Sequence, residues 1–318
     1  MSRLAEVLDA GGPVLTDGGI ETRIMFGTDV VMEPHVQVAA LAGDPEGREL
    51  LRGIYAGYVD SAKEFDLPVI IGSPSFRASP NFIAKAGLAP EAIGRLNEDA
   101  VSLLHEVREA SGHDRVLIAG DIGPSGDAYL PGEALPEDRA AEYHRIQAKV
   151  LAEAGVDFLF APTFPSVAEA EGACVAMAET GIAHVISWIL GPDDRILDGT
   201  SLAEAIRRID ANPNARPAHH SLSCIHPTAA TRAIHELRSE APDEALRLVE
   251  FKANGSPLRT DELVKLDHPV ADPPDRWAEE MIPLYDAGSL RILGGCCGTD
   301  DRHIHALAAL LAGESRTD

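Results

Sequence analysis

Two adjacent cysteines near the end of the chain are the residues with the clearest chemical potential. Cys296 and Cys297 follow two glycines in the segment RILGGCCGTD, which runs from Arg291 to Asp300. Neighbouring cysteines form a strained disulfide with each other, because the bridge needs torsion angles and a Cα separation that a trans peptide does not readily provide. They are good metal ligands if a third cysteine arrives from elsewhere, so the pair raises the question of where that third thiol is.

Short apolar runs recur along the chain and supply the framework that would position such a site. Most contain four to six apolar residues, several of them β-branched, as is typical of parallel strands whose two faces are both covered. The eight runs begin at Pro13, Pro68, Val116, Phe158, His184, His219, Arg247 and Arg291.

Amphipathic helical patterns separate these runs. One begins near Pro136 and ends at Gly155, and its predicted buried face comprises Tyr143, Ile146, Val150, Leu151 and Ala154. The last begins after Thr299, a predicted N-cap, and ends at Gly313. Its predicted apolar stripe comprises Ile304, Leu307, Leu310 and Leu311.

Eightfold alternation of strand and helix predicts an α/β protein with a (β/α)8 TIM barrel as a single domain over residues 1–318. An open doubly wound sheet has a similar periodicity, but the number of strands and the chain length favour the barrel. In such a barrel, functional residues lie at the carboxyl ends of the strands. Those ends carry Asp17, Gly18, Gly19, Ser73, Ser75, Asp121, Thr163, Trp188, Cys224, Asn254, Cys296 and Cys297.

The third cysteine is Cys224, at the end of the sixth predicted strand. Three thiolates favour Zn²⁺, and three protein ligands leave one coordination position open, which is characteristic of a catalytic zinc site. The alternative is three buried thiols that bind no metal. We assign Cys174, within a helical segment, to core packing.

Two neighbouring histidines, His219 and His220, also invite a metal interpretation. Strand alternation would place His220 on the same inward face as Cys224 but roughly 13 Å deeper, beyond reach of the same ion. We therefore predict a hydrogen-bonded core histidine.

The charge balance restricts the partners. The chain has 27 basic and 51 acidic residues and a formal net charge of −24, which disfavours nucleic acid and anionic membranes. No apolar signal core or membrane-spanning run is present, and four cysteines do not make a secreted disulfide framework. We expect a cytoplasmic protein with free thiols.

Several segments together resemble the homocysteine S-methyltransferase family. The segments are TDGGIET, AGDIGPSG, DDRILDGTSLAEA, SCIHP, ANG and LGGCCGT, spread over the whole chain. The resemblance implies a (β/α)8 barrel, a Zn²⁺ cofactor held by Cys224, Cys296 and Cys297, no further catalytic residue, and a role in methionine biosynthesis. It also implies a substrate pocket formed by Asp17, Gly18, Gly19, Ser75, Asp121, Thr163 and Asn254.

The activity implied is methyl transfer to homocysteine or a related small thiol or selenol. A zinc-bound acceptor thiol ionises, because the metal lowers its pKa, and attacks an electron-poor methyl group. A small sulfonium or quaternary ammonium compound is the simplest donor, with S-adenosylmethionine left open. The alternatives are a zinc-dependent hydrolase or lyase on the same barrel, and a non-catalytic zinc-storing or redox-sensing barrel. The oligomeric state is left open.

Departures from the family pattern fall in the expected acceptor pocket. Pro162 replaces the usual acid at the fourth strand end, Ser223 replaces the usual asparagine before Cys224, and Asp121 replaces a small residue. We hypothesise that Asp121 compensates for the missing acid, so that an acceptor ammonium would lie between Asp17 and Asp121, with its carboxylate near Ser75, Arg77 or backbone amides. The competing hypotheses are a mercapto acid without an amino group, and an Asp121 that only caps the following turn.

Overall fold

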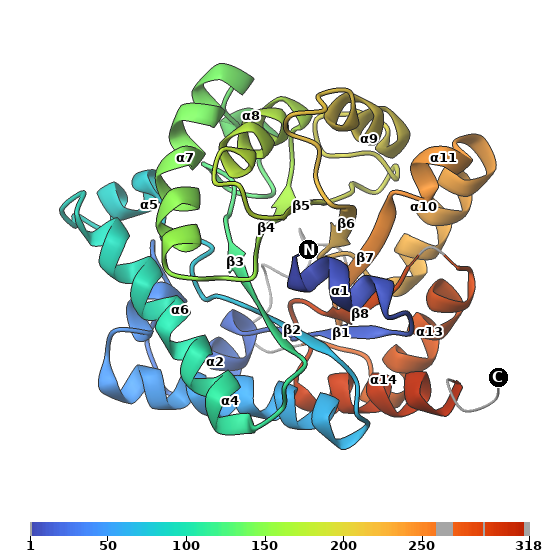
Figure 1. Cartoon of the computed structure of the whole chain (residues 1–318), viewed down its shortest axis with the longest axis horizontal. Helices are drawn as coiled ribbons and strands as arrows, with labels where there is room; N and C mark the ends of the chain where they lie inside the picture. Colours follow the sequence, from blue (N-terminus) through green and yellow to red (C-terminus); the bar gives the residue numbers. More distant parts are fainter. Residues whose placement is uncertain (1, 259–269, 289, 315–318) are drawn as a thin grey trace.

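Eight parallel strands close into one barrel, as the apolar runs predict (Figure 1). The computed structural model describes residues 2–258, 270–288 and 290–314. Strand order follows chain order, and β1 pairs with β8 to complete the barrel. The strands are β1 (Val14–Thr16), β2 (Val69–Gly72), β3 (Val116–Asp121), β4 (Phe158–Phe164), β5 (His184–Trp188), β6 (His220–Ser223), β7 (Leu248–Ala253) and β8 (Ile292–Gly295).

Helices surround the barrel and connect its strands (Figure 1). The helices before β5 are α1 (Arg3–Asp9), α2 (Glu21–Gly27), α3 (Val38–Leu41), α4 (Pro45–Glu64), α5 (Pro80–Lys85), α6 (Ala92–Ser111), the 3₁₀ turn η1 (Pro131–Glu133), α7 (Glu137–Glu153) and α8 (Val167–Ala178). The later ones are α9 (Leu202–Asp210), α10 (Pro227–Glu240), α11 (Pro242–Ala245), α13 (Pro274–Asp286) and α14 (Asp301–Glu314). No helix among the described residues is both long and apolar enough to cross a membrane.

The inside of the barrel changes from apolar to polar along the strands. Leu4 of α1 packs with inward-facing apolar side chains such as Val14, Leu117 and Phe158, and α1 lies across this end of the barrel (Figure 1). Towards the carboxyl ends, the buried residues are polar and include Asp17, Ser187 and Ser223. The apolar end therefore supplies packing, while the other end can hold functional groups.

A shift in strand pairing changes which side chains of β7 face inward. His220 pairs with Leu248, but the next residue, Ser221, pairs with Glu250. Such a bulge reverses the faces of the residues that follow. Phe251 consequently packs in the outer core, and Lys252 faces the barrel interior, where its ammonium reaches Asp17.

The buried face of α7 differs from the predicted one. The residues it buries are Ala140, His144, Gln147, Ala148 and Leu151, whereas Ile146 is 48% exposed. Each of two buried polar side chains has a partner through one of its atoms: the amide nitrogen of Gln147 donates to the Ser75 carbonyl, 2.8 Å away, and His144 Nε2 lies 3.0 Å from a Glu169 oxygen. Apolar periodicity alone could not identify a face that is stabilised by hydrogen bonds.

The last helix agrees with the sequence except at its ends and at one stripe position. Ile304, Leu307 and Leu311 are fully buried, but Leu310 is 36% exposed. Gly313 does not end α14, which runs to Glu314.

His220 is a hydrogen-bonded core residue, as predicted, but the predicted inward direction is wrong. Its Nε2 lies 3.0 Å from Asp210 Oδ1 on α9, and its ring stacks on Trp188, so it faces the surrounding helices. The Trp188 indole donates to His220 Nδ1 over 3.2 Å. Since an indole can only donate, Nδ1 carries a lone pair and Nε2–H donates to Asp210. Strand-end Trp188 is likewise part of the outer core and not of the functional rim.

The neutral His220 predicts an acid-sensitive stability. Burial lowers the pKa of His220 to about 4, against which the Asp210 carboxylate acts only in part. In the unfolded chain a histidine titrates near pH 6.5, so between roughly pH 6.5 and 4 the unfolded state binds the extra proton. The contribution of neutral His220 to the stability of the folded protein is therefore complete above pH 6.5 and is lost as the pH falls from 6.5 to about 4. Relative to His220→Gln, wild type should lose up to about 1.4 kcal/mol of unfolding free energy per pH unit.

Urea unfolding at closely spaced pH values measures this difference. Parallel stability curves for the wild type and His220→Gln between pH 6.5 and 4 would show that His220 is already charged in the folded protein.

Candidate active site

The three predicted ligand cysteines meet at one end of the barrel. Cys224 follows β6, Cys296 and Cys297 follow β8, and their Sγ atoms all lie within 4.8 Å of one another. Cys224 and Cys296 are paired as a disulfide with Cα atoms 5.5 Å apart, while Cys297 is free. The expectation that all thiols are free is therefore wrong for this pair, because β6 and β8 both flank β7 and their final cysteines turn towards each other. Cys174 is buried in α8, as predicted.

Backbone geometry directs Cys224 to this cluster. His220 faces the helices, and simple alternation would send Cys224 to the same side. Cys224 instead has φ of 59°, a left-handed conformation that is uncommon for residues other than glycine. Its N–H donates to the Lys252 carbonyl at 2.9 Å, and the Cys296 N–H donates to the Ala253 carbonyl at 2.7 Å. Strand β7 thus fixes the backbone of cysteines from both neighbouring strands.

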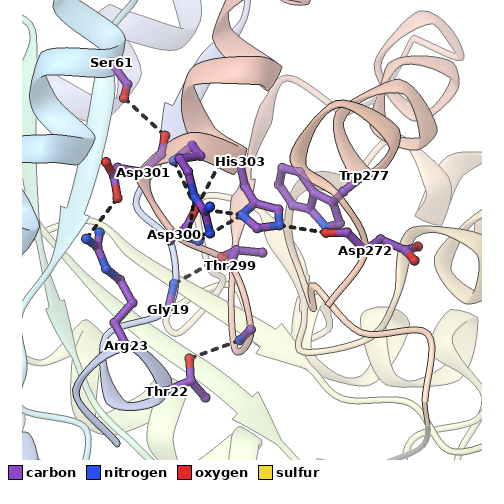
Figure 2. Close-up of polar contacts among 12 residues, drawn as sticks. Gly19, Thr22, Arg23, Ser61, Asp272, Trp277, Thr299, Asp300, Asp301 and His303 are labelled. Atoms are coloured by element: carbon purple, nitrogen blue, oxygen red, sulfur yellow. Dashed lines mark hydrogen bonds and ion pairs between the residues drawn. The ribbon is translucent and has the colours of Figure 1, made fainter. Parts of the chain in front are cut away.

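Hydrogen bonds across the barrel closure hold the turn that carries Cys296 and Cys297 (Figure 2). The Thr299 hydroxyl donates to the Cys296 carbonyl at 2.8 Å and accepts from the Gly19 N–H at 3.2 Å. Gly298 N–H donates to the Thr22 hydroxyl at 3.0 Å. A Cβ on Gly19 would lie 2.8 Å from the Cys296 carbonyl oxygen, so only glycine permits this approach.

The start of α14 fastens the other side of this turn. Thr299 does not cap the helix as predicted, because its hydroxyl is used within the turn. Asp300 caps it instead, with Oδ1 accepting from the Arg302 N–H at 3.0 Å. His303 bridges Asp300 Oδ1, 2.8 Å away, and the Asp272 carbonyl, 3.1 Å away (Figure 2).

Asp17, at the end of β1, forms a buried ion pair that the sequence analysis did not anticipate. Its Oδ1 accepts from the Lys252 ammonium at 2.6 Å, and its Oδ2 accepts from the Gly72 N–H at 2.7 Å. Both side chains are largely buried. The sequence indicated this ion pair only through Lys252, a lysine within an apolar run. The inward direction of the Lys252 side chain depends on the bulge in β7, which the sequence does not indicate.

Asp121, at the end of β3, lies on the other side of Gly72. A Cβ on Gly72 would be 2.8 Å from both Asp121 carboxyl oxygens, and among the described residues Asp121 Oδ1 is buried without a hydrogen-bond partner. Burial raises the pKa of Asp121 well above its usual range, and the charge of Lys252 only partly opposes this. The Asp121 side chain therefore faces the charge cluster and does not cap a turn.

The other predicted pocket residues lie at the same end of the barrel, but several of their polar groups are already engaged. The Ser75 hydroxyl donates to the Asp121 carbonyl at 2.8 Å, and Thr163 donates to the Pro162 carbonyl at 2.7 Å. Asn254 Oδ1 accepts from the Ser256 N–H at 2.9 Å. These residues shape the rim, and their contact with substrate remains a prediction, as it does for Gly18.

Glu21, the first residue of α2, is a further charged group that sequence reasoning missed. Burial raises its pKa, while Arg77 opposes that change. Burial, together with the Glu21 charge, raises the pKa of the free Cys297 thiol to about 12. Without a nearby cation Cys297 therefore stays protonated at neutral pH.

A second group of potential ligands, His226, Asp272 and Glu280, also has ligand atoms within 4.8 Å of one another. Arg276 lies 3.3 Å from Glu280 Oε1 and 3.9 Å from Asp272 Oδ2, and His226 lies 3.2 Å from Asp272. These contacts form a network of hydrogen bonds and ion pairs on the segment that follows Cys224 and on the start of α13.

Comparisons with known proteins identify a family over most of the chain. The family model described as homocysteine S-methyltransferase matches residues 14–311. Homocysteine S-methyltransferase 1 of Arabidopsis thaliana is 26% identical over 94% of this chain and 93% of its own length. The homocysteine S-methyltransferase of Escherichia coli (strain K12) is 25% identical over 96% and 97%.

Solved structures show the same fold. The metallated form of the homocysteine methyltransferase MmuM from Escherichia coli has a TM-score of 0.77 and 22% identity, covering 97% of this chain and 99% of that one. Its oxidized form has a TM-score of 0.78 and 21% identity, covering 98% and 100%.

The Thr299 bridge predicts that the cysteine turn depends on one hydroxyl group. Thr299→Val keeps the side-chain shape but leaves the buried Gly19 N–H without its partner, while the Cys296 carbonyl keeps only the Thr299 N–H at 3.2 Å. It should lower the unfolding free energy by about 1–3 kcal/mol, because unsatisfied buried groups retain their desolvation cost. Thr299→Ser keeps the hydroxyl and should cost less than about 1 kcal/mol. Urea unfolding of both variants under reducing conditions measures this, and equal losses would contradict the bridging role.

Proposed function

The chain belongs to the homocysteine S-methyltransferase family, and we propose that it uses one zinc ion to move a methyl group from a small sulfonium or quaternary ammonium donor to homocysteine or a related small thiol or selenol. Family membership makes it a methyltransferase and displaces the hydrolase, lyase and non-catalytic alternatives. The zinc, the donor and the identity of the acceptor are the parts that we propose.

The observation that carries the zinc proposal is the meeting of the sulfur atoms of Cys224, Cys296 and Cys297 within 4.8 Å. A tetrahedral zinc with bonds of about 2.3 Å requires sulfur atoms about 3.8 Å apart, which this cluster can provide once the Cys224–Cys296 pair is reduced. Thiolates favour zinc, and a three-cysteine site leaves one position for an acceptor sulfur. The metallated form known for MmuM of Escherichia coli also supports a metal.

The chain's own residues would hold and orient the reactants. When bound, zinc would lower the pKa of an acceptor thiol, so that the thiolate is available at neutral pH. Cys224, Cys296 and Cys297 would hold the ion, and the high pKa of Cys297 indicates that this thiol needs such a cation in order to ionise. Thr299 keeps the cysteine turn in position, and Gly19 lets the β1 loop pack against it.

The transfer itself is a displacement at carbon. The acceptor sulfur supplies the electron pair for a new sulfur–carbon bond, while the bond between the methyl carbon and the donor breaks. The positively charged donor keeps that electron pair and leaves as a neutral sulfide or amine. Cys224 is buried, whereas Cys296 and Cys297 are partly exposed, so bound reactants would displace water from this end of the barrel. Loss of water favours a reaction between a thiolate and a cation because both lose charge.

A prediction follows for the metal. Wild type, reduced and supplied with zinc, should bind one equivalent per chain, while Cys296→Ser should bind much less. Methyl transfer to a panel of small thiols should then fall by at least about a hundredfold, because a Lewis-acid metal contributes several kcal/mol to a transition state. Chelation of wild type should have the same effect, reversed by zinc.

Cys174→Ala is the matched control, since that cysteine is buried in α8 away from the cluster. It should keep a full equivalent of zinc. Elemental analysis measures the metal, and a Cys296→Ser protein that retains one equivalent would rule out the three-cysteine site.

A further inference from the structure

The buried ammonium of Lys252 is the charged group at the site that methyl transfer, as derived above, does not use. It lies 2.6 Å from Asp17 Oδ1 and 5.5 Å from the centroid of the Phe160 ring, and its side chain is 11% exposed. An ammonium group has three donors. Asp17 takes one of them, and no other hydrogen bond to this ammonium occurs among the described residues.

The carboxyl groups around Lys252 are those predicted to bind an acceptor ammonium. Asp17 and Asp121 both lie against Gly72, and Lys252 is paired with Asp17 and is the main opposing charge acting on Asp121. The 2.6 Å contact between Lys252 Nζ and Asp17 Oδ1 is that of an ion pair between an ammonium and a carboxylate. The protein's own cation therefore fills the position that the sequence analysis gave to the substrate.

Lys252 is also directly connected to the cysteine cluster. Its carbonyl accepts from the Cys224 N–H at 2.9 Å, and the carbonyl of the next residue, Ala253, accepts from the Cys296 N–H at 2.7 Å. An acceptor whose sulfur reached the cysteines would extend its remaining atoms along the end of β7 and meet this ammonium.

We infer that Lys252 determines acceptor specificity by occupying the ammonium position beside Asp17 and Asp121 and by binding the acceptor's carboxylate. The acceptor class is then a small thiol with a carboxylate and no α-amino group. This inference rests on the proposed methyl transfer for the sulfur chemistry only.

Electrostatics separates this class from amino-acid thiols. A second ammonium placed about 4 Å from Lys252 would be repelled by it, whereas a carboxylate at that distance would be attracted. Asp17 is already engaged by the protein, since Oδ1 accepts from Lys252 and Oδ2 from Gly72. The other acids at the rim are Asp121, whose Oδ1 has no hydrogen-bond partner among the described residues, and Glu21, whose charge is opposed by Arg77; both act against this discrimination.

Binding of the methylated products tests the inference without requiring turnover or metal. Methionine, 4-(methylthio)butanoate and 3-(methylthio)propylamine share one thioether and differ only in the amino and carboxylate groups. Calorimetric titration of the full chain should give 4-(methylthio)butanoate at least about a tenfold lower Kd than methionine, and the amine should bind most weakly. Lys252→Met should weaken binding of the butanoate by about tenfold or more and remove its preference over methionine.

Control variants separate a specific role from a general loss of charge or fold. Lys252→Arg keeps the cation and should keep the preference. Lys149→Met removes an exposed lysine of α7, 70% exposed, and should change nothing. If Lys252→Met does not fold, the ratio of the two affinities in wild type still decides the matter.

Several results would overturn the inference. They are tighter or equal binding of methionine in wild type, an unchanged preference in folded Lys252→Met, and no measurable binding of either carboxylate at millimolar concentration. Failure of the proposed function would look different: homocysteine and 4-mercaptobutanoate would both go unmethylated with every donor, while the product affinities would still report on Lys252.

Discussion

The pairing of β1 with β8 is the interaction on which the site depends. Val14 and Leu15 lie opposite Ile292 and Leu293, and beyond them the Gly295 N–H donates to the Asp17 carbonyl at 2.9 Å. This closure brings the beginning of the chain beside the cysteine turn near its end. Two contacts that hold the turn, from Gly19 to Thr299 and from Thr22 to Gly298, cross this seam. An open sheet of the same strands would lose both and would hold the turn only through β7 and the start of α14.

Much of this arrangement could be predicted from the sequence, because it follows from the topology. Each apolar run contained a strand, and parallel strands bring their carboxyl ends to one side. Cys224 and Cys296 therefore had to approach each other once both were placed at strand ends. The mutual position of Asp17 and Asp121 was predictable for the same reason. None of these predictions required knowledge of a side-chain direction, only of which end of a strand a residue follows.

Side-chain direction is where prediction failed, and the causes are local irregularities. The shifted pairing in β7 reverses the faces of Glu250 and Lys252, and the positive φ of Cys224 reverses the direction expected from His220. Neither feature has a distinctive signal in an apolar run of six residues. The predicted buried face of α7 was wrong for another reason. Its buried polar residues are stabilised by hydrogen-bond partners far away in sequence, which apolar periodicity cannot reveal.

The strained residue Cys224 lies at the polar end of the barrel, whereas the shifted pairing of β7 lies near the starts of β6 and β7. Packing at the apolar end offsets the cost in stability. Thr163 and Cys224 both adopt left-handed φ values, 58° and 59°, at strand ends, although such conformations cost on the order of 1–3 kcal/mol each. None of the buried residues that form the apolar cluster around Leu4 and Phe158 has a left-handed φ. A buried cation such as Lys252 is likewise stable only because Asp17 is held in place by the Gly72 N–H before any substrate arrives. A charge fixed in advance by the fold loses little on ligand binding, so it can discriminate between ligands that differ by one charged group. The division of the barrel into a packed end and a charged end thus allows the framework to keep its cysteine cluster while charged residues at the rim vary, which is the basis of the role proposed for Lys252 and Asp121.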